Sequence, residues 1–325
     1  MKFTNKMDYP KYAIEWLGFD EYDYIDGVIS ATTLLDPPKI HILKKRHKDE
    51  LTIDYSDLIA QRYGTAIHAS FELAPLTNIL LREERLFTEL LDYKISGKPD
   101  LVKQVYDTIT FNGQNIDIQT SMPFTSGDYK AGKIIDLKST SVWSFVYNDK
   151  DEKYVEQLSI YRYLLKENGY YIDDECEILM IFTDWSKKQA RKDSNYPQSR
   201  IATKKLQLYS IEKTKSFLMD KIMALKKLED APESELPPCS RKDLWMKEDE
   251  YAVMRKGGSR AIKLCFTEQE ANEYIVKNNL DPKSYYVELR KAKAKRCEYC
   301  IVRKFCDQYK LMKDIGMVDE VEDNV

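Results

Sequence analysis

The sequence predicts an α/β protein in which a mixed central sheet is flanked by helices. Between about residues 57 and 228, the expected elements follow the order helix, hairpin, strand, helix, strand, helix. The chain has 325 residues, which is enough for one large domain or two ordinary ones. Its 43% of apolar and 32% of charged residues suit a globular protein with a packed core.

The first helix is expected over residues 57–73, with Ser56 as its cap. Its apolar residues recur every four positions: Ile59, Tyr63, Ile67 and Phe71. A second helix is expected to follow, ending near residue 92.

Strands are expected next. Residues 93–111 have the pattern of strand structure, and Asn112-Gly113 directly after them is a strong hairpin signal. Residues 114–120 would return as the partner strand. After a polar, turn-rich stretch, the sequence KIIDLKST at 133–140 predicts a short strand that carries two charges.

The second half of the core is the clearest part of the pattern. Residues 151–169 form an amphipathic helix with one apolar side: Tyr154, Leu158, Tyr161 and Leu165. Residues 176–185 are apolar enough for a central strand, and residues 205–210 are interpreted as a further strand. A helix over about 211–228 completes the core.

An acidic segment with three prolines, residues 229–238, predicts a boundary. It would separate a core domain of residues 1–230, with a helical N-terminal region, from a C-terminal region of residues 231–325.

The chain is expected to be cytoplasmic and to have no membrane partner. The N-terminal residues show no apolar signal region, and no stretch approaches the roughly 20 apolar residues of a membrane span. Lys and Arg total 51 against 54 Asp and Glu, which argues against a surface coated in positive charge but allows a local basic groove.

The charged residues of the strand at 133–140 are the first candidates for chemistry. Asp136 and Lys138 share one strand face, because side chains at i and i+2 point the same way. Asp100 follows Pro99 on a segment that we expect to be a sheet neighbour. Two carboxylates at one sheet edge form a hard oxygen site for Mg²⁺ or Mn²⁺, with His68 as a further ligand. Taken one at a time, these residues could equally be a plain ion pair and a structural histidine.

Four short motifs in order resemble the RecB-like branch of the PD-(D/E)XK nuclease superfamily. Pro99-Asp100 and Asp136-Leu137-Lys138 match its signature. The helical G-x-x-x-H, the G-x-x-D and the Q-x-x-x-Y elements match GTAIH at 64–68, GKPD at 97–100 and QLSIY at 157–161. The resemblance implies a restriction-endonuclease-like core. It also implies site residues that bind metal (His68, Asp100 and Asp136), assist water attack (Lys138) and lie beside the site (Gln157 and Tyr161).

A cysteine cluster predicts a second metal centre. Cys297-x2-Cys300-x5-Cys306 brings three thiols close together, and Cys239 could complete a set of four. Four thiolates suit Zn²⁺ or an iron–sulfur cluster, and the spacing does not separate the two. Cys176 and Cys265 lie in apolar runs and are interpreted as core residues.

The cysteine pattern also resembles that of AddB-type and CRISPR-adaptation nucleases, which implies a structural [4Fe-4S] cluster, with zinc as the alternative. In those proteins the distant cysteine precedes the nuclease motifs, whereas here Cys239 follows them, with Cys265 as a substitute. The segment between Cys239 and Cys297 resembles phage-encoded exonucleases of this kind.

Four basic runs are candidates for contacts with DNA. The runs at 44–48 and 187–192 are interpreted as solvated faces, and a third lies at 204–205. The fourth, 290–296, adjoins the cysteine cluster, so its side chains could follow a phosphate backbone without reading sequence: Lys291, Lys293, Lys295 and Arg296.

Together these features predict an Mg²⁺- or Mn²⁺-dependent deoxyribonuclease, an exonuclease acting in DNA recombination, repair or phage DNA metabolism. Its partners would be DNA and a recombination or replication protein, in the host cytoplasm if the chain is phage-encoded. Two alternatives stay open: a non-catalytic DNA-binding or recombination subunit on the same fold, and a zinc-ribbon interaction protein.

Overall fold

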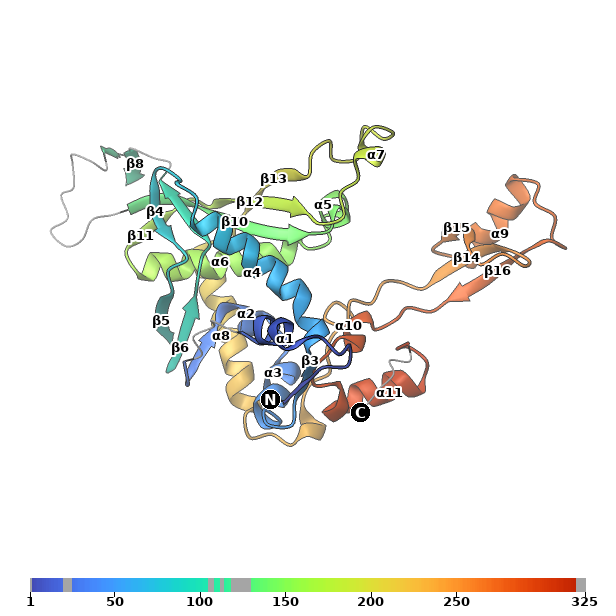
Figure 1. The fold of residues 1–325 in the computed structure, drawn as a ribbon, viewed down its shortest axis with the longest axis horizontal. Coiled ribbons are helices and arrows are strands. Elements are labelled where there is room, and N and C mark those ends of the chain that lie inside the picture. The colour runs from blue at the N-terminus through green and yellow to red at the C-terminus, as the bar shows by residue number, and fades with distance from the viewer. Residues whose placement is uncertain (1, 20–24, 105–107, 112–113, 118–129, 320–325) are drawn as a thin grey trace. The chain divides into compact units, whose positions relative to one another are not determined.

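The computed structural model describes residues 2–19, 25–104, 108–111, 114–117 and 130–319 (Figure 1). The chain divides into two compact units. The large unit contains residues 2–36 and 52–229, and the small unit contains residues 37–51 and those from 230 onward. The expected domains, 1–230 and 231–325, differ from this division at residues 37–51, which belong to the small unit.

The large unit begins with short elements that the sequence did not reveal: β1 (Lys2–Thr4), α1 (Lys11–Gly18), β2 (Val28–Ser30), α2 (Ala31–Leu35), β3 (Thr52–Asp54) and the 3₁₀ turn Tyr55–Leu58. Its sheet and helices follow: α4 (Ile59–Glu72), β4 (Ile79–Arg82), β5 (Leu86–Leu90), β6 (Tyr93–Gly97), β7 (Leu101–Gln104), β8 (Thr108–Phe111), β9 (Gln114–Asp117), β10 (Lys130–Thr140), α5 (Val142–Tyr147), α6 (Asp151–Glu167), β11 (Tyr170–Ile172), β12 (Glu175–Phe182), α7 (Lys187–Ala190), β13 (Ile201–Gln207) and α8 (Ile211–Leu228).

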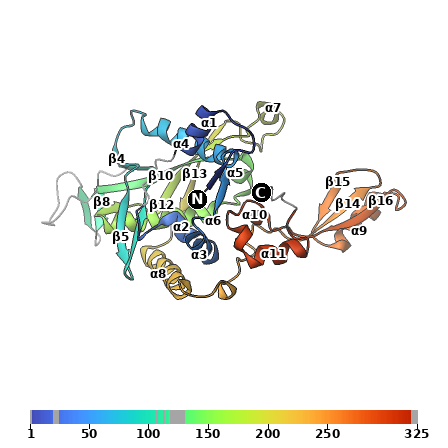
Figure 2. The same cartoon turned by 60° about the horizontal axis from the view of Figure 1, so that its bottom comes forward.

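A mixed sheet of six strands forms the centre of the large unit, which confirms the predicted α/β class. Its strands follow the order β13-β12-β10-β7-β4, and β11 also pairs with β10 (Figures 1 and 2). Strand β10 is parallel to β12 and antiparallel to β7. The two segments that carry Asp100 and Asp136 are therefore sheet neighbours, as predicted.

Helices α4 and α6 cover opposite faces of β10. A Cβ on Gly64 of α4 would lie 3.7 Å from Ser139 Oγ, whereas Lys138 Nζ lies 5.8 Å from the ring centre of Tyr154 on α6. Successive side chains of a strand point to opposite faces, so the two helices contact opposite sides.

Helix α6 is the central helix of the core. Its predicted apolar side is buried throughout: Tyr154, Leu158, Tyr161 and Leu165. The helix ends at Asn168, and Gly169 follows with a positive φ of 85°, a conformation that costs glycine little. The strand pattern predicted at 93–111 corresponds to the three strands β6, β7 and β8. The strands predicted at 133–140 and 176–185 correspond to β10 and to β12, which ends at Phe182, and the helix predicted at 211–228 is α8.

Three local predictions are wrong. The expected second helix, ending near residue 92, is instead the strands β4 and β5, because pairing of β4 with β7 and of β5 with β6 overrides the helix propensity of its Leu, Arg and Glu residues. Asp54, rather than Ser56, caps the turn that leads into α4. Tyr63, which was expected on the apolar side of α4, is 65% exposed. The neighbouring Arg62 is buried instead, and its guanidinium donates to the Leu17 carbonyl.

Strands β8 and β9 pair antiparallel, as the hairpin prediction requires. The predicted turn at Asn112-Gly113 lies outside the described residues.

The small unit has its own elements: α3 (Pro38–Arg46), the 3₁₀ turns Glu233–Glu235 and Arg303–Phe305, β14 (Glu250–Arg255), β15 (Ala261–Cys265), α9 (Glu268–Lys277), β16 (Tyr285–Arg290), α10 (Lys295–Glu298) and α11 (Asp307–Asp314). Strands β15-β14-β16 form a sheet on which α9 packs over a small core: Val253, Cys265, Ala271 and Ile275. Among the residues described in either unit, no helix combines the length and apolarity that crossing a membrane demands.

Candidate active site

Asp136 lies in the middle of β10, in the interior of the sheet. Its side chain is 1% exposed, and within the described residues neither carboxylate oxygen accepts a well-oriented hydrogen bond. Lys138 Nζ approaches Oδ2 at 2.6 Å, an ion pair whose angle is not that of a hydrogen bond. A buried carboxylate normally has several hydrogen-bond donors, so this one is short of partners.

The titration behaviour of the pair follows from this burial. Loss of hydration raises the pKa of Asp136 to about 6, although the ammonium group of Lys138 opposes the shift and the charge of Asp100 adds to it. Burial by itself would lower the pKa of Lys138, but the carboxylate of Asp136 raises it above its ordinary value. Lys138 is therefore a cation at neutral pH.

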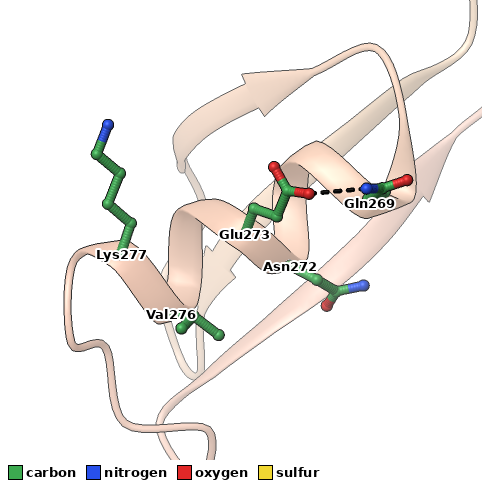
Figure 3. Close-up of a pocket in the computed structure, with 5 residues that line it drawn as sticks. All are labelled: Gln269, Asn272, Glu273, Val276 and Lys277. Carbon is green, nitrogen blue, oxygen red and sulfur yellow. Dashed lines mark hydrogen bonds between the residues drawn. The ribbon is translucent and has the colours of Figure 1, made fainter.

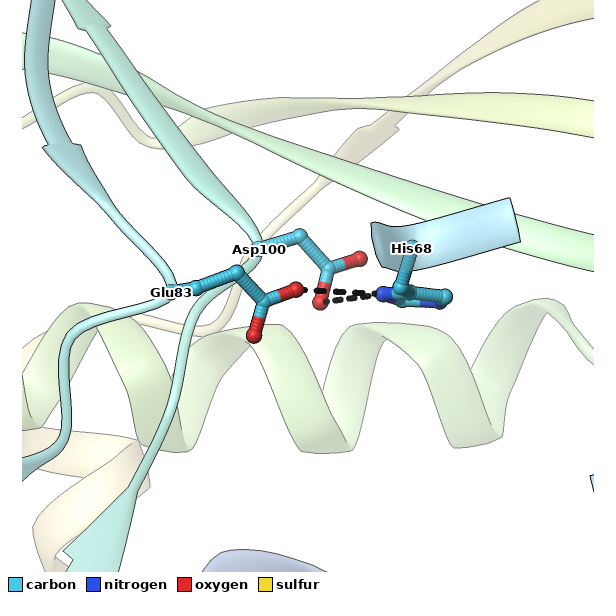
Figure 4. Close-up of side chains that lie close together, drawn as sticks. All are labelled: His68, Glu83 and Asp100. Carbon is cyan, nitrogen blue, oxygen red and sulfur yellow. Dashed lines mark hydrogen bonds and ion pairs between the residues drawn. The ribbon is translucent and has the colours of Figure 1, made fainter. Parts of the chain in front are cut away.

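A histidine and two carboxylates come together beside this strand from three elements (Figure 4). His68 projects from α4, Glu83 follows β4, and Asp100 precedes β7. His68 Nδ1 lies 3.2 Å from Glu83 Oε1 and 3.4 Å from Asp100 Oδ1. One ligand atom from each residue lies within 4.8 Å of the others.

The backbone holds this group next to Asp136. The amide of Leu137 donates to Asp100 Oδ2 at 2.7 Å, which fixes Asp100 against β10. The amide of Glu83 donates to the Asp100 carbonyl at 3.1 Å. Asp136 itself is not a member of the compact group of three, which among the described residues consists of His68, Glu83 and Asp100.

The donor set fits a hard divalent cation. Two carboxylates and an imidazole match the ligands of Mn²⁺ and, through the carboxylates, of Mg²⁺. Hydrogen bonds to Asp100 and Glu83 raise the pKa of His68 to about 10, so a protonated imidazole balances the two acids. A bound cation would take over that role, releasing the proton, and the carboxylate of Asp136, which pairs with Lys138, would lie close by.

Gln157 and Tyr161 lie on the side of α6 that faces the sheet. Gln157 Nε2 donates to Tyr161 Oη at 3.0 Å, and Tyr161 is 6% exposed. Burial raises the pKa of Tyr161. Gly97 allows this approach, since a Cβ there would lie 2.9 Å from the Tyr161 ring and 2.5 Å from Leu164 Cδ1.

Glu83 is the site residue that the sequence did not reveal. The pattern of the segment around it, LREER, predicts a helix surface, where neighbouring charges are unremarkable. No spacing rule connects Glu83 with His68 or Asp100. Its position becomes meaningful only when β4 pairs with β7 and brings residue 83 beside residue 100.

The four predicted cluster cysteines line one narrow cavity of the small unit: Cys239, Cys297, Cys300 and Cys306, with Lys39, Ile40 and Leu43 of α3 among the other lining residues. Burial raises the pKa of Cys239 to about 12 and that of Cys297 to about 11, and the neighbouring thiols add to both shifts. Cys265 lies in the separate core beneath α9 and does not line this cavity.

The predicted DNA-binding lysines are largely engaged elsewhere. Lys293 and Lys295 pair with Asp319 at 3.1 and 2.6 Å, and Lys295 also pairs with Glu298. Arg296 lies over the Trp245 ring at 5.8 Å. Lys291, an exposed side chain, shows neither an ion pair nor a ring contact within the described residues.

A hollow on the outer face of α9 is another concave feature of the small unit (Figure 3). Gln269 donates there to Glu273 at 2.8 Å, and Val276 is 76% exposed. This hollow brings no cluster of acids, thiols or histidines together, so we assign it no chemistry.

No protein-family model and no curated protein matches the chain. Among the solved structures that are similar to it is "Crystal structure of SSO0001", with a TM-score of 0.37 and 17% sequence identity over 69% of this chain and 85% of that chain. The case for the candidate site therefore depends on the chain's own residues.

Proposed function

We propose that this protein is a divalent-metal-dependent deoxyribonuclease of the PD-(D/E)XK type, acting as an exonuclease. One observation carries the proposal: Asp136, a buried carboxylate that accepts no well-oriented hydrogen bond from the described residues, lies beside a compact His68–Glu83–Asp100 group and forms an ion pair with Lys138. A structural ion pair alone gives no reason for a second set of acids around one histidine.

The metal would be held by His68, Glu83 and Asp100, with Asp136 next to them. When bound, it would polarise the scissile phosphate and lower the pKa of a bound water molecule. In the overall reaction, the oxygen of water bonds to phosphorus, the phosphorus–oxygen ester bond breaks, and the leaving oxygen takes up a proton.

The chain's own residues have distinct tasks in this proposal. Lys138 stays protonated because of Asp136, so it stabilises negative charge on the phosphate rather than acting as a base. Tyr161 and Gln157, joined by their hydrogen bond, form the wall of the site on α6.

For the small unit we propose a structural [4Fe-4S] cluster bound by Cys239, Cys297, Cys300 and Cys306, with zinc as the alternative. The support is that all four thiols line one cavity. The raised pKa values of Cys239 and Cys297 describe the metal-free state, in which these two thiols are protonated; a bound metal would stabilise the thiolates instead.

The nuclease proposal is tested by digestion of end-labelled linear and circular DNA with Mg²⁺ or Mn²⁺, using protein purified without oxygen. Asp136→Asn, which keeps the shape of the side chain, should lower cleavage of linear DNA by at least about 100-fold. Asp220→Asn on the exposed side of α8 is the matched control and should cleave like the wild type. Equal activity of wild type and Asp136→Asn would refute the proposal, and cleavage of circles would refute the exonuclease assignment.

A further inference from the structure

We infer that the ends of β10 and β12 carry a binding surface for single-stranded DNA, formed by α5 and α7. We call it the α5–α7 surface and define it by Trp143, Tyr147, Lys187, Lys188, Arg191 and Lys192. The inference deepens the proposed nuclease function, on which it rests for the role of DNA as substrate, by naming the form of the substrate.

Topology places α5 and α7 at the same end of the sheet. Strands β10 and β12 are parallel, and Thr140 pairs with Phe182 at their carboxyl ends. Helix α5 follows β10 directly, and α7 follows β12. In α/β sheets, ligands bind outside the carboxyl ends of parallel strands. At about 3.3 Å per residue, Thr140 lies about 13 Å along β10 from Asp136.

Two aromatic rings are exposed on α5 and already stacked. The rings of Trp143 and Tyr147 are 5.7 Å apart with 17° between their planes. Trp143 is 40% exposed and Tyr147 is 68% exposed. Large aromatic side chains normally lie in a core, whereas a stacked, solvent-facing pair offers a surface for an unpaired base.

The aromatic pair is rigidly supported. Asp184 accepts from Ser141 Oγ at 2.6 Å and from the amide of Val142 at 2.7 Å, which fixes the first turn of α5. The ring edge of buried Tyr196 lies against Trp143, with centroids 5.9 Å apart. A prearranged stacking surface loses little conformational freedom when a ligand binds.

Tyr196 also connects the aromatic pair, Trp143 and Tyr147, to a group of basic side chains at α7. Tyr196 Oη accepts from the amide of Ser186, the residue that caps α7. The exposed basic side chains begin at the next residue: Lys187, Lys188, Arg191 and Lys192. No ion pair occupies these four within the described residues. Segment 183–200 holds five basic residues against two acidic ones, and Asp184 is used in capping α5.

Exposed aromatics and unpaired cations together are the recognition chemistry of single strands, whose bases can stack while the phosphates meet positive charge. The chain contains an internal comparison. Helix α1 also exposes two aromatics four residues apart, Tyr12 at 75% and Trp16 at 59%, but Lys11 beside them is paired with Glu15. The α1 pair therefore lacks the free positive charge of the α5–α7 surface.

The test is binding of fluorescently labelled oligo(dT) to the full-length protein in EDTA, where metal-dependent cleavage is absent. Tyr147→Ala should weaken binding by about 5- to 100-fold, the range for loss of one stacked base. Tyr12→Ala is the matched control and should bind like the wild type. Because Tyr147 is 68% exposed, the variant should keep the fold, which circular dichroism can check.

The contribution of the basic side chains is measured separately, by the salt dependence of binding. Replacing Lys187 and Lys188 by Gln should lower the slope of log Kd against log salt by about 0.7 for each phosphate that the variant no longer neutralises. The same change at exposed Lys226 and Lys227 on α8 should leave the slope unaltered.

Three results would overturn the inference: equal affinity of Tyr147→Ala and wild type, tighter binding of a duplex of the same length, or tighter binding of oligo(rU). If Asp136→Asn abolishes cleavage while Tyr147→Ala binds normally, only this inference fails. If no cleavage is found but Tyr147→Ala loses oligo(dT) binding, the surface stands and the nuclease proposal fails.

Discussion

Glu83 lies on a backbone conformation that non-glycine residues adopt seldom, with a φ of 46°. The conformation turns the chain out of β4 and directs the carboxylate toward His68. Lys98 pairs with the second oxygen of Glu83 at 2.8 Å, so the side chain is held from two sides. Left-handed conformations of this kind are enriched where a side chain must be aimed at a site.

The proposed role of Glu83 predicts a sharp contrast with its neighbour. Glu83→Gln removes one negative charge from the group and should lower both Mn²⁺ affinity and DNA cleavage by at least about 10-fold. Glu84→Gln, an exposed side chain one position away, should alter neither. Calorimetric titration with Mn²⁺ and the digestion assay measure the two effects. Identical behaviour of the two variants would show that Glu83 has no part in metal binding.

Substitution by alanine should have different effects on stability at Gly64 of the GTAIH motif and at Gly97 of the GKPD motif. Gly97→Ala would place a Cβ against Tyr161 and Leu164 of α6, an overlap that should cost about 1–3 kcal/mol of unfolding free energy. Gly64→Ala would place a Cβ 3.7 Å from Ser139 Oγ, an ordinary contact, inside a helix that alanine favours. Chemical denaturation should therefore show loss for Gly97→Ala and none for Gly64→Ala; the reverse order would contradict the close packing of β6 on α6.

Among the elements, the N-terminal strand and the start of α4 depend on one buried acid. Asp54 accepts hydrogen bonds from Thr4 Oγ1, from the Lys6 amide, and from both the amide and the hydroxyl of Ser56. These bonds hold β1 against β3 and begin the turn before α4. Although burial acts in the opposite direction, they lower the pKa of Asp54 from 3.8 to about 2.

This lowered pKa predicts how stability depends on pH. An acid with a lower pKa in the folded state stabilises the fold above its unfolded pKa, so the contribution is complete above about pH 4 and is lost as the pH falls toward 2. Its size is about 2 kcal/mol. Asp54→Asn should be less stable by about this amount at pH 7, and the difference from wild type should shrink as the pH falls toward 2. A difference that stays constant down to pH 2 would contradict this account of Asp54.

The strand pairing of the large unit explains how the site is assembled. Strands β4, β7 and β10 are neighbours in the sheet. Glu83 directly follows β4, Asp100 directly precedes β7, and Asp136 lies in the middle of β10. Helix α4 adds His68 from one face and α6 adds Tyr161 from the other. The acids therefore converge because of sheet order, although they are far apart in sequence.

For the complete chain, the two units have separate cores. The large unit packs around the central sheet and α6, whereas the small unit has the core under α9 and the cavity lined by cysteines. Buried apolar side chains also line this cavity: Ile40, Leu43, Leu244, Val302 and Tyr309. A metal centre there would add its binding energy to the packing of these side chains.

Loss of one cluster ligand should accordingly affect the small unit alone. Cys297→Ser should reduce bound iron and sulfide in anaerobically purified protein and increase hydrogen exchange in α3, α10 and α11, while α6 of the large unit keeps its protection. Cys265→Ala, at a cysteine outside the cavity, should retain the metal. Zinc in the wild type would replace the iron–sulfur assignment, and no metal of either kind would refute a bound centre.

Local sequence patterns were sufficient to predict the elements whose periodicity is strong and whose neighbours agree with it. The alternating pattern of β10 and the four-residue repeat of α6 predicted Asp136, Lys138, Gln157 and Tyr161 on the correct elements. Asp100 and His68 were predicted as site residues through short motifs around a proline and a glycine. Each of these signals is local, because it depends only on residues within one or two turns or strands.

Features that depend on pairing between distant segments became visible only in the folded chain. In the folded chain, residues 79–90 form strands rather than the expected helix, and Glu83 lies beside His68. Residues 37–51 belong to the same unit as the cysteine region. It also separated Cys265 from the cluster and placed Trp143 against Tyr196 at the end of the sheet. Sheet pairing and burial depend on contacts between residues that are far apart in the chain, and local propensity does not specify those contacts.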